Sequence, residues 1–320
     1  MALIHSVKDV EHLIISSTLD FSTDYVCLEM ERRGLSYLRL NRDRFSFYKV
    51  KYMVDRQTLF IHINNDDYSV SPESLKSVYF RSPVFIRSNK PYPLEQQLYR
   101  SQWSSFIRNL MVFSSARWLN HPVSTYLAEN KVYQLDRAKA IGLEIPNTVI
   151  TNFADAGFLS DDELYVVKAL DTPLFYEDGK EMFTYSTIST GKEIKKSSLQ
   201  DAPVIIQECI QDKTDLRVTV IGEKLFPAAI TKSDRGIDGD WRRTKKEDLQ
   251  YKPIELPEDI IYKLQQLMKN LNLSFGGVDL AFSKGKYYFI EVNPTGEWGW
   301  LVKTTGYEID KEIVNWLTGQ

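Results

Sequence analysis

The chain has 320 residues, 43% of them hydrophobic and 26% charged, which is enough to bury a large core in two or three lobes. Forty basic against 43 acidic residues give a formal charge of -3, a balance that argues against nucleic acid as a partner. The first residues carry charges where a signal peptide is apolar, and no segment reaches the roughly 18 apolar residues of a membrane span. Two cysteines in apolar stretches, Cys27 and Cys209, favour free thiols in a cytoplasmic protein.

The first third of the chain predicts a small α/β lobe. Residues 12–43 have the pattern of a strand, a polar turn, an amphipathic helix that ends at Gly34, and a second strand. Alternating strand-like runs follow within residues 51–70, and a short strand is expected at 78–85. Apolar residues at helical spacing over residues 94–120 complete the lobe. We expect it to end near residue 123.

The rest of the chain is richer in strand patterns. A helix stopped by Gly142 leads into a strand, and further strands are expected at 163–170, 202–210 and 216–230. An amphipathic helix at 257–273 precedes a hairpin that turns at Lys284 and Gly285, and a helix at 307–319 ends the chain. The expected domains are therefore 1–123, a central lobe at 124–210 and a C-terminal lobe at 211–320.

The stretch "FIEVNPTGEW" at 289–298 places two oxygen-bearing side chains, Glu291 and Asn293, on one face of a strand end. The hairpin turn brings Asp279 roughly opposite Glu291. Two carboxylates side by side repel each other, and a hard cation such as Mg²⁺ makes the arrangement favourable. The alternative is a plain turn in which Asn293 bonds its own backbone.

Further candidates lie upstream of this strand end. Lys168 lies among apolar strand residues and needs a partner if it is buried, such as a phosphate; alternatively it extends from a strand edge. Polar residues at 207 and 208 interrupt an apolar strand, a pattern suited to a hinge over a flat ligand. Asp215 and Arg217 share one face, where Arg217 would stabilise charge on a transferred phosphoryl group, or the two would form a surface ion pair.

In this order, the segments resemble the successive motifs of ATP-grasp enzymes from about residue 124 to the C-terminus. The matching segments are "ENKVYQLDRAKAIGLEIPNT", "YVVKAL", "QECIQDKTDLRVTVIG" and "GGVDLAFSKGKYYFIEVNPTGEWGWL". "DLRVTVIG", "DGDWRR" at 238–243 and "EVNPTGEWGWL" resemble more closely the graspetide synthetases of the microviridin-ligase type, and "YFRSP" is similar to an arginine-containing segment of their N-terminal domain. The resemblance implies an α/β protein with an ATP-grasp fold and an N-terminal pre-ATP-grasp α/β domain.

The resemblance also implies roles for individual residues. ATP would be bound by Lys131 and Lys168 at the phosphates, by Gln207, Glu208, Cys209 and Ile210 at the adenine, and by Asp215 at the ribose. Mg²⁺ would be bound by Asp279, Glu291 and Asn293. Arg217 would lie over the reacting centre, and Arg242 and Arg243 would grip an acidic acceptor, since guanidinium matches carboxylate bidentately. One departure is that residues 170–194 contain only Gly179 and Gly191, where many ATP-grasp enzymes have a glycine-rich loop over the phosphates.

The implied chemistry is carboxylate activation. A carboxylate attacks the γ-phosphate of ATP, and a hydroxyl or amine then displaces phosphate from the acyl phosphate. In the resembled family the carboxylate is an Asp or Glu of a ribosomal precursor peptide, composed of leader and core, and the product is an ester or amide macrocycle. Two alternatives stay open: a ligase that joins free amino acids or adds glutamate to a protein, and a nucleotide- or peptide-binding module without catalysis. The precursor, the bond type, the ring topology and the oligomeric state, a homodimer included, are not specified by the sequence.

Overall fold

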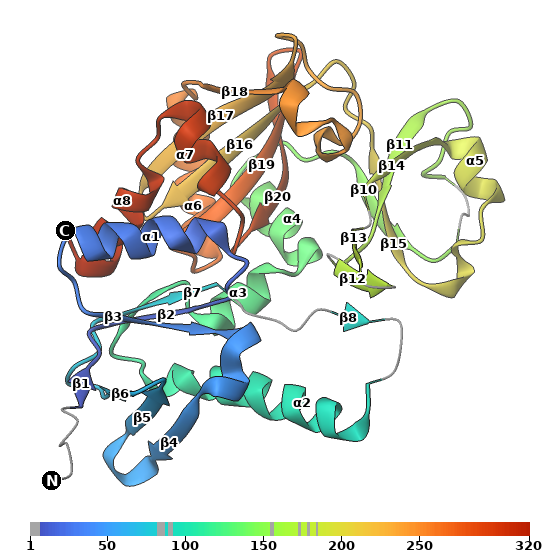
Figure 1. The fold of residues 1–320 in the computed structure, drawn as a ribbon. Coiled ribbons are helices and arrows are strands. Elements are labelled where there is room, and N and C mark those ends of the chain that lie inside the picture. The colour runs from blue at the N-terminus through green and yellow to red at the C-terminus, as the bar shows by residue number, and fades with distance from the viewer. Residues whose placement is uncertain are drawn as a thin grey trace, which may run out of the picture.

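The computed structural model describes residues 7–81, 87–88, 92–153, 157–171, 174–177, 180–183 and 185–320. The elements gather into an N-terminal lobe, a central lobe and a larger C-terminal lobe, and the central lobe projects to one side (Figure 1). None of the helices in these residues combines the length and the apolar character needed to cross a membrane. Short 3-10 turns connect the main elements: η1 (Arg42–Phe47), η2 (Val54–Arg56), η3 (Leu110–Val112), η4 (Leu199–Asp201), η5 (Trp241–Arg243) and η6 (Lys246–Asp248).

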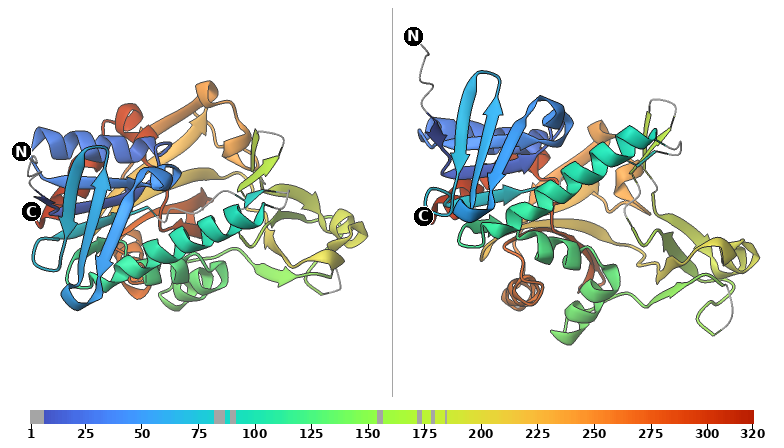
Figure 2. Two further views of the ribbon diagram at one scale, coloured as in Figure 1. Left: turned by 60° about the horizontal axis from the view of Figure 1, so that its bottom comes forward. Right: turned by 90° about the horizontal axis from the view of Figure 1, so that it is seen from below.

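The N-terminal lobe is built on a parallel sheet, as the strand-helix-strand pattern predicts. Its strands are β2 (His12–Ser16), β3 (Tyr37–Asn41), β7 (Ser77–Phe80) and β9 (Arg117–Leu119), in the order β3-β2-β7-β9, and α1 (Phe21–Arg32) connects β2 to β3. A second sheet, in the order β1-β6-β5-β4, consists of β1 (Lys8–Asp9), β4 (Lys49–Met53), β5 (Thr58–Ile63) and β6 (Asp66–Val70). Helix α2 (Leu94–Asn109), which runs along the lobe (Figure 2), covers only the first part of the segment 94–120 with predicted helical spacing, because the end of that segment forms η3 and β9.

The central lobe is a small antiparallel sheet. Its strands, in the order β10-β15-β11-β14, are β10 (Thr148–Thr151), β11 (Leu164–Lys168), β14 (Thr187–Thr190) and β15 (Val204–Glu208), and α5 (Gly191–Lys196) follows β14. Beside it, β12 (Leu174–Glu177) pairs with β13 (Lys180–Phe183) and, in parallel, with β8 (Arg87–Ser88) of the N-terminal part. The central lobe therefore contacts the N-terminal lobe through strand pairing.

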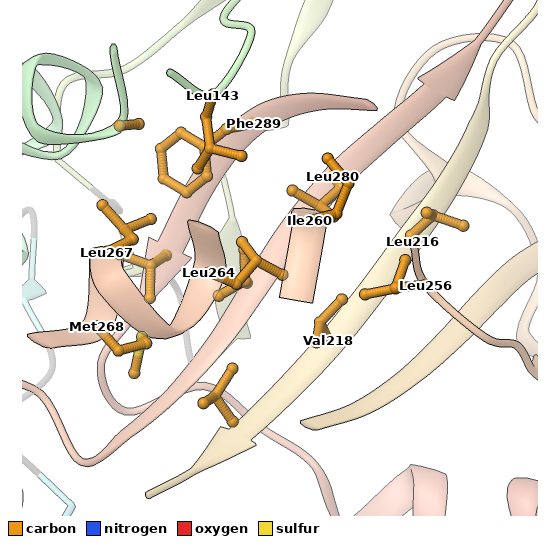
Figure 3. Close-up of a cluster of buried hydrophobic side chains, with 14 of the residues drawn as sticks. Leu143, Leu216, Val218, Leu256, Ile260, Leu264, Leu267, Met268, Leu280 and Phe289 are labelled. Atoms are coloured by element: carbon orange, nitrogen blue, oxygen red, sulfur yellow. The ribbon is translucent and has the colours of Figure 1, made fainter. Parts of the chain in front are cut away.

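The C-terminal lobe contains a five-stranded sheet in the order β18-β17-β16-β19-β20. The strands are β16 (Thr214–Ile221), β17 (Lys224–Lys232), β18 (Leu249–Pro253), β19 (Phe275–Ser283) and β20 (Lys286–Asn293). Leu264 and Leu267 of α6 (Glu258–Asn270) pack on Val218, Leu280 and Phe289 of this sheet (Figure 3). The hairpin of β19 and β20 turns at Lys284 and Gly285 as predicted, with both residues at positive φ.

Two more helices cover the same face of this sheet. They are α3 (Pro122–Ala128) and α4 (Lys131–Ala140), and Ala128 and Ala138 are fully buried in the core that α6 shares with β16 and β19. The proposed division at 124–210 groups α4 with the central lobe, whereas its packing joins it to the C-terminal sheet. Its amphipathic pattern indicates a buried face but does not specify which sheet covers that face.

The opposite face of the sheet packs on the N-terminal lobe. Val26 and Met30 of α1 share one apolar core with Trp298, with Leu301 of α7 (Gly299–Thr305) and with Ile313 of α8 (Ile309–Thr318). All of these side chains are fully buried. The N- and C-terminal lobes therefore form a continuous hydrophobic core, and the end of β20 lies beside their junction.

Candidate active site

The β19/β20 hairpin brings the predicted acidic side chains together. Asp279 is directly opposite Glu291, and Gly277 is opposite Asn293, with a register shift between Asp279 and Leu280. The predicted pairing of Asp279 with Glu291 is thus confirmed. The two carboxylates line a cavity together with Lys168 of the central lobe.

Three cations contact these two carboxylates. Lys131 Nζ lies 2.6 Å from Glu291 Oε2, and Arg217 Nη1 donates to Asp279 Oδ1 at 2.7 Å. Arg242 Nη2 donates to Asp279 Oδ2 at 2.9 Å and lies 3.8 Å from Glu291 Oε1. Burial alone would raise the pKa of Glu291, but the charges of Lys131, Lys168 and Arg242 hold that pKa far below its usual value. Asp240 also lies 3.4 Å from Arg242 Nη1, so with Lys168 the cluster holds four cations against three carboxylates, and this surplus of positive charge attracts an anionic ligand.

Lys131 reaches this cluster because a buried glutamine fixes its helix. The side-chain amide of Gln134 accepts from Val292 N at 2.9 Å and donates to Val292 O at 2.8 Å, so α4 is tied to β20. Gln134 is only 2% exposed. Its role was not predicted from the sequence, although a glutamine on the apolar face of an amphipathic helix is the signal for such a contact.

Lys168 lies at the end of β11, opposite the two carboxylates. Its Nζ donates to Gln207 Oε1 at 3.0 Å, and Gln207 in turn donates to Thr148 Oγ1 at 2.8 Å. Because β11 is an interior strand of its sheet, the alternative of a lysine at a strand edge is wrong. Burial lowers the pKa of Lys168, and the charge of Glu291 opposes that shift. Its neutral amide partner does not balance its charge, so a phosphate would complete the site.

A cavity lies between the central and C-terminal lobes, with an empty volume of about 830 Å³ that includes space open to solvent. Val166, Ile188 and Ile290 contribute apolar surface, which suits a flat ring. The predicted residues that line it are Lys168, Gln207, Glu208, Cys209, Ile210, Asp215, Arg242, Asp279 and Glu291. Lys131 and Arg217 are not part of this lining, but Lys131 contacts the lining residue Glu291 and Arg217 contacts the lining residue Asp279.

The strand that carries the predicted hinge leaves the sheet at the cavity. Glu208 N donates to Asn147 O at 2.8 Å, and Cys209 N donates to Leu164 O at 3.1 Å. Burial raises the pKa of the Cys209 thiol. Both cysteines are free, which agrees with the expectation of unpaired thiols.

Asp215 and Arg217 do not pair with each other. Asp215 Oδ2 lies 2.5 Å from Lys213 Nζ, whereas Arg217 turns to Asp279 and is only 5% exposed. The alternative of a surface Asp-Arg pair is therefore wrong. Burial, with a further contribution from the charge of Asp279, raises the pKa of Asp215 to about 6 against the pull of Lys213.

The remaining candidates differ in their positions. The guanidinium of Arg242 lies over the Trp241 ring at 4.8 Å and stays 42% exposed at the cavity, whereas Arg243 lies over Tyr185 at 5.6 Å. Asn293 Oδ1 accepts from Thr295 N at 3.0 Å, so the turn contact considered as an alternative is present. Gly179, one of the two glycines of segment 170–194, lies outside the described residues.

The donor set can be compared with the needs of a divalent cation. Among the described residues, no three or more His, Cys, Asp or Glu side chains lie close enough together to hold a metal ion by themselves. Two carboxylates, already balanced by Lys131, Arg217 and Arg242, do not suit a resident ion. They suit Mg²⁺ that arrives with phosphates, because that ion usually binds through one or two carboxylates plus substrate oxygens.

Comparison with known proteins identifies the domain. Residues 177–317 match the model of the RimK-like ATP-grasp domain. Proteins named probable alpha-L-glutamate ligase are 27% identical over 62% of this chain and 66% of the relative from Mannheimia succiniciproducens, and 25% identical over 61% of this chain and 65% of the one from Histophilus somni. The match therefore spans just under two thirds of the length of these curated relatives.

Solved structures match over nearly the whole chain. The macrocyclase MdnC from Microcystis aeruginosa, bound with precursor peptide MdnA, is 24% identical with a TM-score of 0.80, covering 97% of this chain and 100% of that one. The RiPP-associated ATP-grasp ligase from Chryseobacterium gregarium, in complex with ADP and a leader and core peptide, is 25% identical with a TM-score of 0.81, covering 97% of each chain. The chain therefore has an ATP-grasp fold, as the order of its motifs predicts, and its residues 177–317 are similar to the RimK-like ATP-grasp domain.

Proposed function

We propose that this protein is an ATP-dependent carboxylate ligase that activates Asp or Glu side chains of a ribosomal precursor peptide and closes ester or amide macrocycles. The observation that carries the chemistry is the pair of opposed carboxylates, Asp279 and Glu291, surrounded by cations at a cavity between two lobes. Such an arrangement suits a crowded set of phosphates and a metal ion. The peptide substrate is supported by likeness to two peptide-bound ligases over the N-terminal lobe as well as the ATP-grasp part.

ATP binding is assigned to the cavity. Lys131 and Lys168 hold the phosphates, the segment of Gln207, Glu208, Cys209 and Ile210 receives the adenine, and Asp215 receives the ribose. Asp279, Glu291 and Asn293 hold Mg²⁺, which when bound offsets the charge of the transferring phosphoryl group. Lys131, whose ammonium contacts Glu291 Oε2 at 2.6 Å, would be released to contact a phosphate oxygen if Glu291 held Mg²⁺.

The reaction has two steps. A carboxylate oxygen of the peptide attacks the γ-phosphorus, the bond to the β-γ bridging oxygen breaks, and ADP leaves. A hydroxyl or amine of the same peptide then attacks the acyl carbon, loses its proton, and phosphate departs with one former carboxylate oxygen. Arg217 stabilises the charge that develops in these steps. Arg242 grips the acceptor carboxylate at the rim of the cavity, with Arg243 assigned to the same acidic peptide surface.

A second candidate is a ligase that adds glutamate to a protein or joins free amino acids. The curated relatives named probable alpha-L-glutamate ligase favour it, although their similarity covers only about 62% of this chain. A binding module without catalysis is disfavoured because Lys131, Lys168, Arg217, Asp279 and Glu291 are all present and gathered around one cavity.

The test uses a candidate precursor encoded beside the gene, from a short reading frame rich in Thr, Asp, Glu or Lys. The protein, ATP, Mg²⁺ and this peptide are incubated with and without a mixture of free amino acids, including glutamate, and the masses of the peptide and of the amino acids, ADP and phosphate are measured. We expect one water lost from the peptide for each ADP and each phosphate released. A mass gain equal to an added amino acid supports the second candidate. If ATP binds but neither the peptide nor free amino acids are changed, the ligase assignment is wrong.

A further inference from the structure

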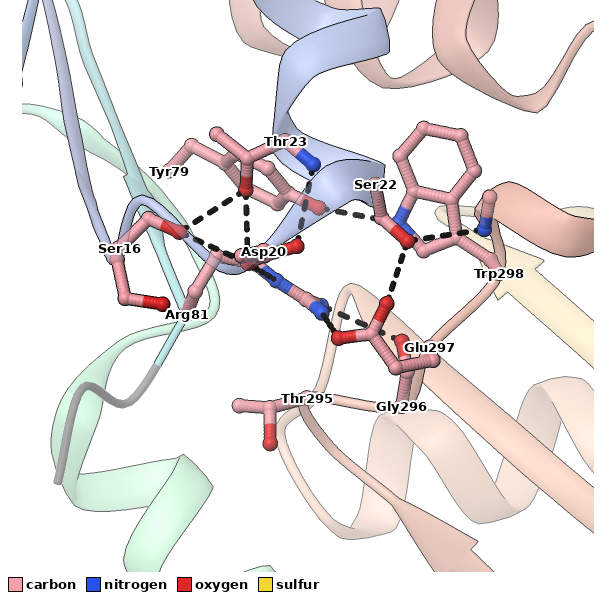
Figure 4. A network of polar contacts seen from close by, with 12 residues as sticks. Ser16, Asp20, Ser22, Thr23, Tyr79, Arg81, Thr295, Gly296, Glu297 and Trp298 are labelled. Carbon is pink, nitrogen blue, oxygen red and sulfur yellow. Dashed lines mark hydrogen bonds and ion pairs between the residues drawn. The ribbon is translucent and has the colours of Figure 1, made fainter. Parts of the chain in front are cut away.

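A buried arginine of the N-terminal lobe contacts the loop that follows the proposed metal strand. Arg81 comes directly after β7 and is only 8% exposed. Its Nε donates to Asp20 Oδ2 at 2.9 Å, its Nη2 to Glu297 Oε1 at 3.0 Å and its Nη1 to Gly296 O at 3.3 Å (Figure 4). One guanidinium therefore joins the start of α1 to the loop at residues 294–298.

Other N-terminal residues fix the same loop. Ser22 Oγ donates to Glu297 Oε2 at 2.5 Å, and Trp298 Nε1 donates to Tyr79 OH at 3.2 Å (Figure 4). Asn120 Nδ2 donates to Pro294 O at 3.0 Å. The position of loop 294–298 is thus set by the N-terminal lobe at both ends and in the middle.

Arg217 contacts this loop from the other side. Its Nη2 donates to Glu297 O at 3.2 Å while its Nη1 donates to Asp279 Oδ1 at 2.7 Å. A Cβ added to Gly277 would lie 2.6 Å from Arg217 Cζ, and one added to Gly296 would lie 2.7 Å from Arg217 Nη2. The guanidinium therefore occupies a narrow slot between two glycine backbones, and one wall of that slot is loop 294–298.

We propose that Arg81 is a positioning residue for the reacting centre: by fixing loop 294–298 it holds the Arg217 slot closed and keeps Arg217 aimed at Asp279. Arg81 lies on the far side of the loop and contacts neither Asp279 nor Glu291 in the described structure. Among the described residues, Arg81 reaches the C-terminal lobe through its hydrogen bonds to Gly296 and Glu297 and through a cation–π contact with the ring of Phe275 at 5.8 Å. The hydrogen bonds to Gly296 and Glu297 are the ones that fix the wall of the slot. The inference rests on the proposed function, because it takes Arg217 to act in the chemical step.

The test compares two arginines that both bridge the N- and C-terminal lobes. Arg81→Gln removes the contacts to loop 294–298. Arg33→Gln is the matched control, since Arg33 joins Glu29 of α1 at 2.7 Å to Asn315 of α8 at 2.8 Å. We expect both variants to melt earlier, but only Arg81→Gln to lower kcat for precursor-dependent ADP release, by about 10²-fold, with the Kd for ATP changed less than about threefold. Equal kcat losses in both variants, or none in Arg81→Gln, would overturn the proposal.

A milder variant covers the case in which Arg81→Gln does not fold. Glu297→Gln keeps the shape of a side chain that is 60% exposed and removes only the charge facing Arg81. It should lower kcat in the same direction by a smaller factor, again with little change in the Kd for ATP. Full kcat in a folded Glu297→Gln protein, together with an unfolded Arg81→Gln protein, would mean that the network serves folding only.

A readout without turnover separates this inference from the proposed function. Arg217 Nε is buried, and because water cannot reach it in the closed slot, its N–H proton should exchange slowly. In ¹⁵N NMR spectra, with the signal assigned by its loss in Arg217→Lys, we expect faster exchange in Arg81→Gln and unchanged exchange in Arg33→Gln. If wild-type protein turns over no precursor but this pattern holds, the proposed function is wrong and the positioning role stands. Identical exchange rates in the wild-type, Arg81→Gln and Arg33→Gln proteins would show that the positioning role is wrong.

Discussion

Two clusters of ionised side chains lie on either side of loop 294–298, and their charge balance differs. At the cavity, Lys131, Arg217 and Arg242 contact two carboxylates, Asp279 and Glu291. At the lobe junction, Arg81 is the one cation of the described residues that contacts the two carboxylates of Asp20 and Glu297. The cavity cluster has more cations than carboxylates and is therefore suited to bind an anion. At the lobe junction the carboxylates already neutralise Arg81, so no ligand is required there.

The pKa values agree with this contrast. Burial by itself would raise the pKa of Asp20, but Arg81 and the hydroxyls of Ser16 and Thr23 lower it to about 2. These partners all belong to the protein itself. At the cavity, in contrast, the hydrogen-bond acceptor of Lys168 among the described residues is a neutral amide, and burial lowers the pKa of Lys168. The charges of the lobe-junction cluster are therefore neutralised within the folded chain, while Lys168 of the cavity cluster is suited to take a new partner when a ligand binds.

The largest effect is expected where the cavity cluster loses a carboxylate. Glu291→Gln and Asp279→Asn should each lower turnover by about 10³-fold while the fold stays intact, because each removes a metal-binding charge with little change in shape. The measurement is Mg²⁺-dependent ADP release, with circular dichroism to check folding. Asp161→Asn, which breaks an exposed pair with Lys195, is the matched control and should turn over normally. Normal Mg²⁺-dependent activity in both site variants would refute the metal assignment.

Arg217→Ala should lower the chemical step by about 10²-fold or more and ATP affinity far less, because a cation aimed at developing charge acts mainly on the transition state. Single-turnover kinetics and calorimetry measure the two quantities. Arg217→Lys is the conservative comparison, because it keeps the charge but lacks the fork that binds Asp279 and Glu297 O together. A parallel loss of ATP affinity and rate in Arg217→Ala would place this residue at the nucleotide instead.

Two adjacent glycines offer a finer test of the slot. Gly277→Ala places a methyl group against the Arg217 guanidinium, whereas Gly276→Ala, on the other face of β19, meets Val292 and Met268 of the apolar core. We expect Gly277→Ala to lower kcat by about tenfold or more through displacement of Arg217. Gly276→Ala should lower the melting temperature without a matching loss of kcat in the folded protein. The reverse pattern in the two variants would contradict the slot.

Lys168→Ala should weaken ATP binding by about tenfold, because a charge-assisted contact to a phosphate is lost. Isothermal calorimetry with ATP and Mg²⁺ measures the Kd. Lys195→Ala, in the same lobe but exposed and paired with Asp161, controls for loss of a positive charge and should bind ATP as wild type does. Unchanged affinity in Lys168→Ala would leave this lysine with a role in the sheet alone.

The sequence predicted what depends on local spacing. The opposed pair of Asp279 and Glu291 follows from a two-residue repeat and one tight turn, so spacing alone was enough to place these side chains opposite each other. The partner of Arg217 could not be predicted in this way, because spacing suggested Asp215 whereas the pairing of β16 with β19 places Asp279 directly opposite. Register between strands far apart in the chain is set by packing, which a single sequence does not reveal.

The lobe junction was beyond prediction for a related reason. Arg81 and Glu297 are 216 positions apart, and no local pattern connects them. The resemblance of "YFRSP" to a known segment drew attention to this arginine without assigning its contacts. Likewise, the helix that carries Lys131 was recognised from its periodicity, but its attachment to β20 depends on one buried amide, Gln134.

The smallest effect concerns pH and Asp215. Its pKa rises from 3.8 to about 6 on folding, chiefly through burial, so the folded state binds more protons than the unfolded state between these values. The contribution of this group to stability is therefore fully present at low pH and is lost as pH rises through the folded pKa.

The variant Asp215→Asn removes that dependence of stability on pH. We expect the unfolding free energy of wild type, relative to Asp215→Asn, to fall by on the order of 1 kcal/mol between about pH 4 and about pH 7, with the partner Lys213 limiting the size. Urea unfolding at several pH values measures the difference. An opposite slope would mean that Lys213 outweighs burial and that folding lowers the pKa of Asp215.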